Sequence, residues 1–286
     1  MVAAYGVCVK TVHLPVAGAL LLAACATPPA STDVARARPS FELQKIVPAA
    51  LLREANHGRD VEGPDGRFVV PRGVRRVWID VGAHLLETSR TELETHDDVA
   101  VVAIEPLAEC WKTWPANPRL TALPVAISLE RGWLDFNVNA ANVTSSLLKS
   151  VEGNEFDALT RTVEVRKVPV IRLEDVLERI PDIEIEFLET DVQGLDLQVL
   201  KSGGEQLRRV KRVQAEVINE RIYDGKGALR QGTETEFIEY MASKGFQFLG
   251  DSSVWERRAW VDKQFINPQR MGWLWRARRR IRSLFS

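Results

Sequence analysis

Continuous hydrophobic runs recur along the middle of the chain, and each ends in acidic residues or glycine. Residues 77–82 read Val-Trp-Ile-Asp-Val-Gly, and residues 99–104 read Val-Ala-Val-Val-Ala-Ile before Glu105. Strands of a parallel sheet are buried on both faces, so they are hydrophobic throughout rather than alternating. We therefore predict two buried parallel strands, the first ending at Asp80, with a helix over residues 89–94 between them.

The rest of the middle region continues this alternation of strand and helix patterns. Residues 133–138 alternate like an exposed hairpin strand, and hydrophobic residues at helical spacing predict helices that stop at Gly203-Gly204 and Lys244-Gly245. The other predicted strands are residues 120–127, 183–188, 213–218, 246–249 and 258–266. This order predicts a doubly wound, mainly parallel α/β sheet that is covered on both faces and binds ligands at the carboxyl ends of its strands.

Acidic residues follow three of the predicted strands. Asp80, Glu105 and Asp191 each stand at or just beyond the carboxyl end of a hydrophobic run. One such acid is commonly a solvated strand end, but three in one α/β unit indicate a shared site. We therefore expect their side chains to meet at one edge of the sheet.

The first 32 residues differ from the middle. An apolar run over residues 16–26 is too short to span a bilayer and fits the hydrophobic part of a signal peptide. Leu22-Ala23-Ala24-Cys25 looks like the lipobox of bacterial lipoproteins, and residues 27–32 fit a tether. Two interpretations stay open: a lipoprotein lipidated at Cys25, or a leader that merely ends in this pattern.

The segment 267–286 forms a basic tail. Residues 270–286 contain six arginines and no acid, and Trp273 and Trp275 lie among them. As a helix this tail would be amphipathic and suited to an anionic membrane surface. A solvated tail, or a helix docked on its own domain, is the alternative.

Composition narrows the classes of function. The 286 residues include 38 basic and 39 acidic side chains, a net charge of -1, which gives no field for nucleic acid. Three cysteines far apart in the sequence predict neither a disulfide framework nor a metal site. The length suits one main domain, which we place at residues 70–266, after a helical or irregular extension over 33–69.

The motifs along this domain resemble the FkbM-type methyltransferases in order and spacing. The matching motifs are Asp80-Val81-Gly82-Ala83, Ile104-Glu105-Pro106, Val125-Ala126-Ile127-Ser128, Asn142 with Ser145-Ser146, Thr190-Asp191-Val192-Gln193-Gly194, Ala215-Glu216-Val217 and Ile222-Tyr223. The resemblance spans about residues 70–266. It implies a Rossmann-like, class I methyltransferase fold.

The resemblance also implies an activity and roles for residues. The family transfers a methyl group from S-adenosylmethionine, usually to a hydroxyl of a sugar, polyketide or lipid-like small molecule, and needs no metal. The cofactor contacts that it implies are Asp80, Gly82, Ala83, Glu105 and Ser128, with Glu105 on the ribose hydroxyls. Asp191 would orient the acceptor hydroxyl or take its proton. The acceptor contacts that it implies are Asn142, Ser145, Ser146, Glu216 and Tyr223.

Three positions depart from the family pattern. Leu86 stands where a second glycine is expected, and leucine does not readily take positive φ, which predicts weakened cofactor binding. His84 replaces an asparagine and is either solvated or a contact or base for the ligand. Glu189 replaces a lysine before Asp191.

These observations leave two hypotheses. The first is a cytoplasmic S-adenosylmethionine-dependent O-methyltransferase, membrane-associated through its basic tail. The second is an exported lipoprotein, anchored at Cys25, that keeps the fold as a non-catalytic binding module. A nicotinamide oxidoreductase is disfavoured because the first strand is not followed by Gly-x-Gly-x-x-Gly.

Overall fold

The structure is a computed structural model, and it describes residues 38–255 and 259–272. The predicted leader, the tether and Cys25 lie outside the described residues, as does the basic tail from residue 273 onward. Among the residues that are described, no helix is long and apolar enough to cross a bilayer.

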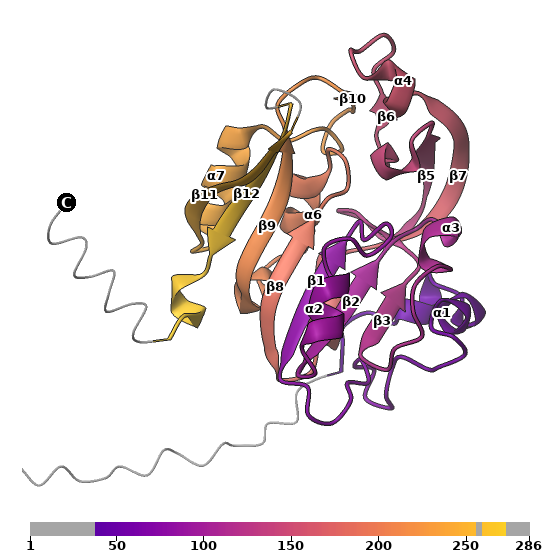
Figure 1. The fold of residues 1–286 in the computed structure, drawn as a ribbon, viewed down its shortest axis with the longest axis vertical. Helices are drawn as coiled ribbons and strands as arrows, with labels where there is room; N and C mark the ends of the chain where they lie inside the picture. The colour runs from indigo at the N-terminus through magenta and orange to yellow at the C-terminus, as the bar shows by residue number, and fades with distance from the viewer. Residues whose placement is uncertain (1–37, 256–258, 273–286) are drawn as a thin grey trace, which may run out of the picture. The chain divides into compact units, whose positions relative to one another are not determined.

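A seven-stranded sheet forms the centre of the fold (Figure 1). In order across the sheet the strands are β11 (Gln247–Trp255), β12 (Trp260–Ile266), β9 (Val210–Ile218), β8 (Glu184–Thr190), β1 (Arg76–Val81), β2 (Val99–Ile104) and β3 (Leu120–Leu123). The strands from β9 to β3 are parallel, whereas β12 is antiparallel to both of its neighbours. This topology confirms the predicted mainly parallel, Rossmann-like sheet. The first strand runs one residue beyond Asp80, to Val81.

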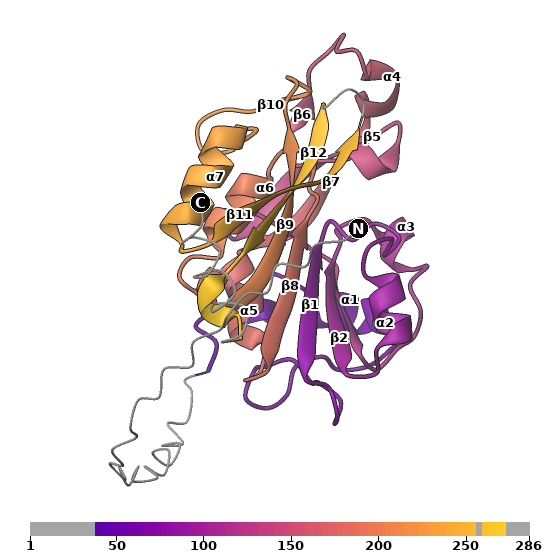
Figure 2. The same ribbon diagram turned by 60° about the vertical axis from the view of Figure 1, so that its left-hand side comes forward.

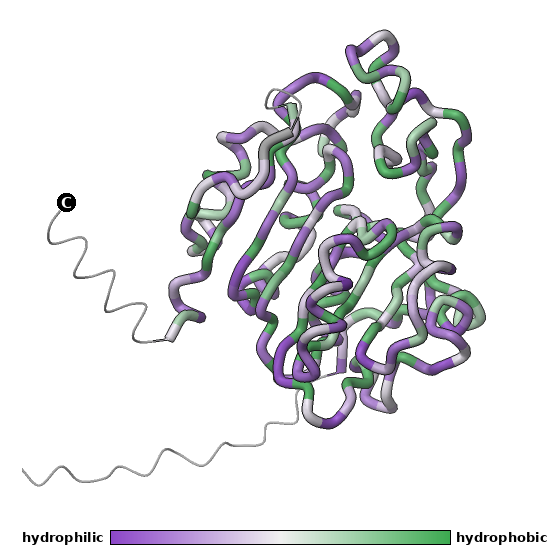
Figure 3. Tube along the Cα trace, viewed as in Figure 1, coloured by the Kyte–Doolittle hydropathy of each residue, from purple (hydrophilic) through white to green (hydrophobic). Residues whose placement is uncertain are grey.

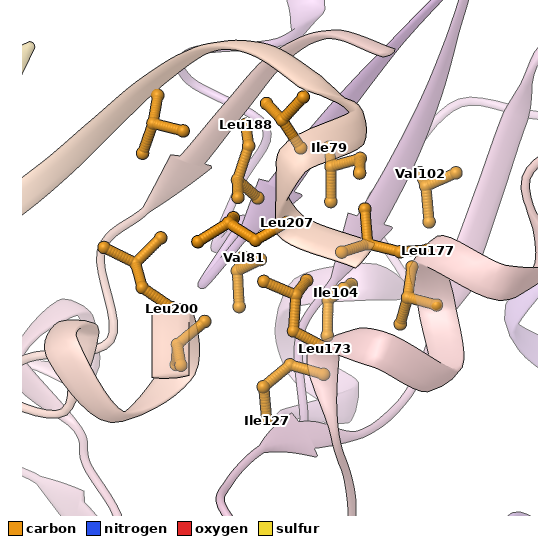
Figure 4. Packing of buried hydrophobic residues seen from close by; sticks show 14 of the residues in the cluster. Ile79, Val81, Val102, Ile104, Ile127, Leu173, Leu177, Leu188, Leu200 and Leu207 are labelled. Atoms are coloured by element: carbon orange, nitrogen blue, oxygen red, sulfur yellow. The ribbon is translucent and has the colours of Figure 1, made fainter. Parts of the chain in front are cut away.

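Hydrophobic packing explains why β2 is apolar throughout. All six residues of β2 are buried, and Figure 3 shows hydrophobic segments along the strands at the centre of the sheet. Ile79, Leu188, Leu177 and Leu200 belong to one buried cluster that joins the sheet to the helices α5 and α6 (Figure 4).

Helices cover the two faces of the sheet unequally. The helices are α1 (Ala49–Ala55), α2 (Arg90–Thr95), α3 (Ala108–Trp111), α4 (Asp157–Thr160), α5 (Leu173–Arg179), α6 (Asp196–Ser202) and α7 (Glu234–Ser243). On one face α5, α6 and α7 pack in the main cluster, and on the other Leu93 of α2 packs against Val101 and Ala103 of β2 (Figure 2). The predicted helix stops hold, since α6 ends at Ser202 and α7 at Ser243.

The prediction of one strand over residues 120–127 is wrong. The segment divides into β3 and β4 (Ala126–Ile127), which belong to different sheets. Pro124 lies between them, and a proline has no N–H to donate to a strand ladder. The break turns the chain out of the main sheet at the carboxyl end of β3.

A small second layer, which we call the cap (residues 132–171), stands over the carboxyl ends of the central strands (Figure 1). Its strands β5 (Gly132–Asn139) and β7 (Thr162–Ile171) pair antiparallel, and β4 joins β7 in parallel. The hairpin strand predicted at residues 133–138 is therefore confirmed, whereas its partner β7 was not predicted. The cap also carries the 3₁₀ helix η2 (Asn142–Thr144) and β6 (Lys149–Ser150), which pairs with β10 (Tyr223–Asp224).

The segment before residue 70 packs into the domain. Leu43, Val47 and Leu52 belong to the main buried cluster. The buried guanidinium of Arg179 donates a hydrogen bond to Glu62 over 2.7 Å. The boundary that we predicted at residue 70 thus does not coincide with a break in packing.

Candidate functional site

A cleft of about 250 Å³ opens at the carboxyl ends of β1, β2 and β8, beneath the cap. The strand order reverses at β1, since β2 and β3 follow on one side and β8 and β9 on the other. In open α/β sheets this switch point is where ligands bind, because the connections leave β1 and its neighbour in opposite directions. The cleft therefore occupies the position that the alternating pattern predicted.

Carboxyl groups dominate the charge of the cleft. The three acids that we predicted to meet, Asp80, Glu105 and Asp191, all line the cleft. Among the described residues, Glu87 and Glu189 bring the carboxyl groups in the lining to five, and no lysine or arginine lines the cleft. The site thus favours a cationic ligand and disfavours phosphate.

The turn after β1 requires glycine for two reasons. Gly82 has a φ of 86°, a left-handed conformation that is energetically unfavourable for any residue with a side chain. A Cβ on Gly82 would also lie 1.8 Å from the carbonyl oxygen of Asp191. The Asp191 N–H donates to the Val81 carbonyl over 2.9 Å, so the ends of β1 and β8 are in contact. The resemblance explained Gly82 by the approach of a ligand, whereas the structure shows that the neighbouring backbone already requires it.

Asp80 and Glu105 are both buried and both hold the loop that follows β1. The Ser89 hydroxyl donates to Asp80 Oδ2 over 2.5 Å. Glu105 accepts the N–H of Leu107 over 2.8 Å and that of His84 over 3.2 Å, one on each oxygen. Burial raises the pKa of Asp80 to about 6 and that of Glu105 to about 7, although these donors oppose the shift. A bound cation or hydrogen-bond donor would favour the ionised forms.

Asp191 is half-buried and held from behind by a polar network. The Gln193 amide donates to Asp191 Oδ1 over 2.7 Å and to Glu216 Oε2 over 3.0 Å. The Tyr223 hydroxyl lies 2.8 Å from both Gln193 Oε1 and the Thr144 carbonyl oxygen. Burial raises the pKa of Asp191 to about 6, and burial and the charge of Asp191 raise that of Glu216 further above its ordinary range. The network orients the Asp191 carboxyl into the cleft.

Four residues expected to contact ligands lie behind the wall of the cleft. Ser128 follows β4, and its N–H is bonded to the Ile171 carbonyl in β7. The Ser146 hydroxyl donates to the Gln193 carbonyl over 2.8 Å. Glu216 and Tyr223 both hydrogen-bond to Gln193, and the Glu216 carboxyl group also interacts directly with that of Asp191. None of these four residues is among those that line the cleft, whereas the predicted contacts Gly82, Ala83, Asn142 and Ser145 line it.

Leu86 adopts the backbone conformation of the expected glycine, and its side chain points away from the cleft. Its φ is 65°, so a leucine does occupy the left-handed region. The side chain is fully buried with Leu93, Trp111 and Trp114, and it is not among the residues that line the cleft. Burial of a leucine contributes about 1.5–3 kcal/mol, which offsets a left-handed cost of about 1–2 kcal/mol.

Glu189, the residue in place of a lysine, belongs to the site. It lines the cleft, and Gln214 donates to its Oε1 over 3.0 Å. Burial and the charge of Asp80 raise its pKa to about 8. A neutral carboxyl group at this position relieves repulsion among the neighbouring acids.

Sequence reasoning missed the apolar part of the lining. Leu107, Val125 and Ile127 line one part of the cleft, and Phe136 and Leu147 of the cap line another. The alternation over residues 133–138 indicated which side of that strand is buried, but nothing local indicated what the strand covers. In the ranges that the structure describes, no group of His, Cys, Asp and Glu side chains is placed to hold a metal ion.

A family match and several structural similarities connect the chain to known proteins. A family model described as the methyltransferase FkbM domain matches residues 80–248. No curated protein matches the chain. Among solved structures, the chain is similar to magnesium protoporphyrin IX methyltransferase from Synechocystis PCC 6803, at 9% identity over 68% of this chain and 70% of that one, with a TM-score of 0.37. It is also similar to 1,6-didemethyltoxoflavin-N1-methyltransferase from Burkholderia thailandensis, at 15% identity over 68% and 72% of the chains, with a TM-score of 0.36.

Proposed function

The chain belongs to the FkbM methyltransferase family, and on that premise we propose that it methylates a hydroxyl of a sugar, polyketide or lipid-like small molecule with S-adenosylmethionine. One observation carries this proposal. The carboxyl groups of Asp80, Glu105 and Asp191 line one cleft at the switch point of the sheet.

The residues of the cleft fit S-adenosylmethionine. This cofactor combines an apolar purine, a ribose with two hydroxyls, and a cationic sulfonium and ammonium. Leu107, Val125 and Ile127 provide apolar surface for the purine, and Glu105 has lone pairs left for ribose hydroxyls after it accepts two N–H groups. Five carboxyl groups without lysine or arginine suit the positive charges. When bound, the cofactor supplies an electrophilic methyl group.

The cap side of the cleft supplies the acceptor site. Phe136, Val143 and Leu147 are apolar, while Asn142 and Ser145 offer hydrogen bonds. Asp191 lies at the end of β8, where its carboxylate would orient an acceptor hydroxyl or accept its proton. Alignment of the reacting atoms and exclusion of water would supply most of the rate. The acid-rich lining favours a small uncharged acceptor over RNA, whose phosphates it would repel.

The alternative of a non-catalytic binding module relied on Leu86. Leu86 packs away from the cleft, which supports the catalytic alternative. The proposal of lipidation at Cys25 concerns residues that the structure does not describe, and it bears on location rather than on the site.

Calorimetric titration of the full chain with S-adenosylmethionine and its demethylated product tests the proposal. We expect one saturable site per chain that both compounds share. Transfer of a labelled methyl group to a small-molecule extract would then show the activity. Absence of binding for both compounds would refute the function.

A further inference from the structure

His84 joins the two walls of the cleft. It lies in the loop after β1 with a φ of 39°, and its ring faces the cap. Its N–H donates to Glu105, and its carbonyl accepts the Trp114 indole N–H over 2.8 Å, so the backbone is held on both sides. Its Nε2 lies 3.1 Å from Asn142 Oδ1, at the start of η2 in the cap. This contact links residues 58 positions apart in the chain.

The partners of the ring determine where its protons are. Nδ1 lies 2.9 Å from Glu87 Oε1. Burial opposes ionisation of Glu87, but hydrogen bonds from His84 and the backbone outweigh it and lower the pKa of Glu87 below its ordinary value. A carboxylate oxygen only accepts hydrogen bonds, so Nδ1 carries a proton.

The second ring nitrogen also faces an acceptor. Asn142 turns its Oδ1 toward Nε2 and its Nδ2 toward the sulfur of Cys110, 3.8 Å away. Burial raises the pKa of Cys110 to about 12, so the sulfur is a thiol. An amide oxygen cannot donate, so the contact at Nε2 needs a proton on that nitrogen too. Both nitrogens donate only in the imidazolium form.

Carboxyl groups face the ring from three sides. Glu87 faces it from its own loop, Glu105 from the end of β2 and Asp191 from the end of β8. Glu109 of α3 is paired with Arg166 of β7 over 2.7 Å. The guanidinium of Arg90 on α2 donates to the Leu85 carbonyl over 3.0 Å and is the opposing charge near this loop.

We propose that His84 is a positioning residue that, as an imidazolium, donates to Glu87 and Asn142 and so holds the cap closed over the cleft. The effect of this closure on cofactor binding rests on the proposed function, whereas the closure itself does not depend on it. Loss of a proton would set an unprotonated Nε2 against the Asn142 oxygen and remove this link, leaving the cap held by its other contacts, such as those of Ser146 and Tyr223.

Replacing Asn142 distinguishes an imidazolium that donates to Asn142 from a neutral ring that accepts a hydrogen bond from it. In Asn142→Ala the imidazolium loses an acceptor, so His84 should bind its proton about two- to tenfold more weakly, the effect of one hydrogen bond. If Asn142 instead donated to a neutral ring, the same change would strengthen proton binding. Asn142 is exposed, so the variant should fold.

The measurement is an NMR titration of the imidazole nitrogens in the full chain without ligand, between about pH 5 and 8. His84 is assigned by the signals missing in His84→Asn. His96, exposed and 3.1 Å from Glu92, is the matched control and should titrate identically in both proteins. A shift of His84 in the stated direction supports the proposal, and no shift or the reverse shift overturns it.

Hydrogen exchange then tests closure. At low pH, residues 139–150 should exchange faster in His84→Asn than in the unaltered chain, and His96→Asn should leave them unchanged. Equal exchange in all three proteins would show that His84 does not hold the cap. Neither experiment contains S-adenosylmethionine, so a negative result here would not contradict the proposed function. Likewise, absence of cofactor binding would not contradict the closure by His84.

Discussion

Gly82 and Asp191 touch across the ends of β1 and β8, so closely that a Cβ on Gly82 would lie 1.8 Å from the Asp191 carbonyl oxygen. One contact thereby sets both the turn after β1 and the position of the proposed catalytic carboxyl group. Packing of the backbone and chemistry of the site depend on the same glycine.

Gly82→Ala should therefore be more destabilising than its φ alone implies. Gly58 is the matched control, because its φ of 83° is nearly that of Gly82, at 86°, and nothing lies within 4 Å of a Cβ there. We expect Gly58→Ala to cost about 1–2 kcal/mol from its conformation, and Gly82→Ala about 1–3 kcal/mol beyond that from overpacking. Urea unfolding measures both, and equal losses would contradict the steric argument.

Glu105→Ala should lower the affinity for S-adenosylmethionine by roughly ten- to a hundredfold, if a charge-assisted hydrogen bond contributes about 1.5–3 kcal/mol. The variant also frees the N–H groups of His84 and Leu107, so Glu105→Gln, which keeps the size of the side chain, is measured beside it. Glu109→Ala, an exposed acid nearby, is the control. Calorimetry showing unchanged affinity in Glu105→Ala would count against the ribose role.

Asp191→Asn should reduce methyl transfer while leaving cofactor affinity within a few fold. The amide keeps the hydrogen-bonding size but cannot accept a proton from the acceptor hydroxyl. Transfer of a labelled methyl group gives the rate, and calorimetry gives the affinity, with the exposed Asp97→Asn as control. Lost affinity with retained turnover would reverse the assignment.

Leu86→Gly restores the residue that the family pattern expects, and it should not improve cofactor binding. Loss of the buried side chain exceeds relief of the left-handed backbone, so we expect the free energy of unfolding to fall by about 2–4 kcal/mol. Urea unfolding and calorimetry provide the two readouts. A rise in affinity for S-adenosylmethionine would show that Leu86 does obstruct the cleft.

Glu189 should make the protein less stable at alkaline pH. Its folded pKa of about 8 exceeds its ordinary value of 4.5, so its contribution is fully present below about pH 4.5 and is lost as pH rises through about 8. Between pH 5 and 9, Glu189→Gln should lose less unfolding free energy than the unaltered chain, by on the order of 1–3 kcal/mol. Parallel pH dependences of the two proteins in urea unfolding would disprove this effect.

The sequence by itself determined the doubly wound sheet and the meeting of Asp80, Glu105 and Asp191. Both follow from local pattern: hydrophobic runs mark buried strands, and the carboxyl ends of parallel strands lie at the same edge. The break at Pro124 was also visible locally, although we read residues 120–127 as one strand.

Only the tertiary structure decided what those local elements face. Leu86 takes a left-handed conformation because a distant hydrophobic cluster receives its side chain, and Glu216 and Tyr223 support Asp191 from behind, both through Gln193 and Glu216 also directly. The contact between His84 and Asn142 depends on a cap whose strand β7 was not predicted at all. Periodicity specifies which side of an element is buried, but the partner that buries it depends on packing between segments far apart in the chain.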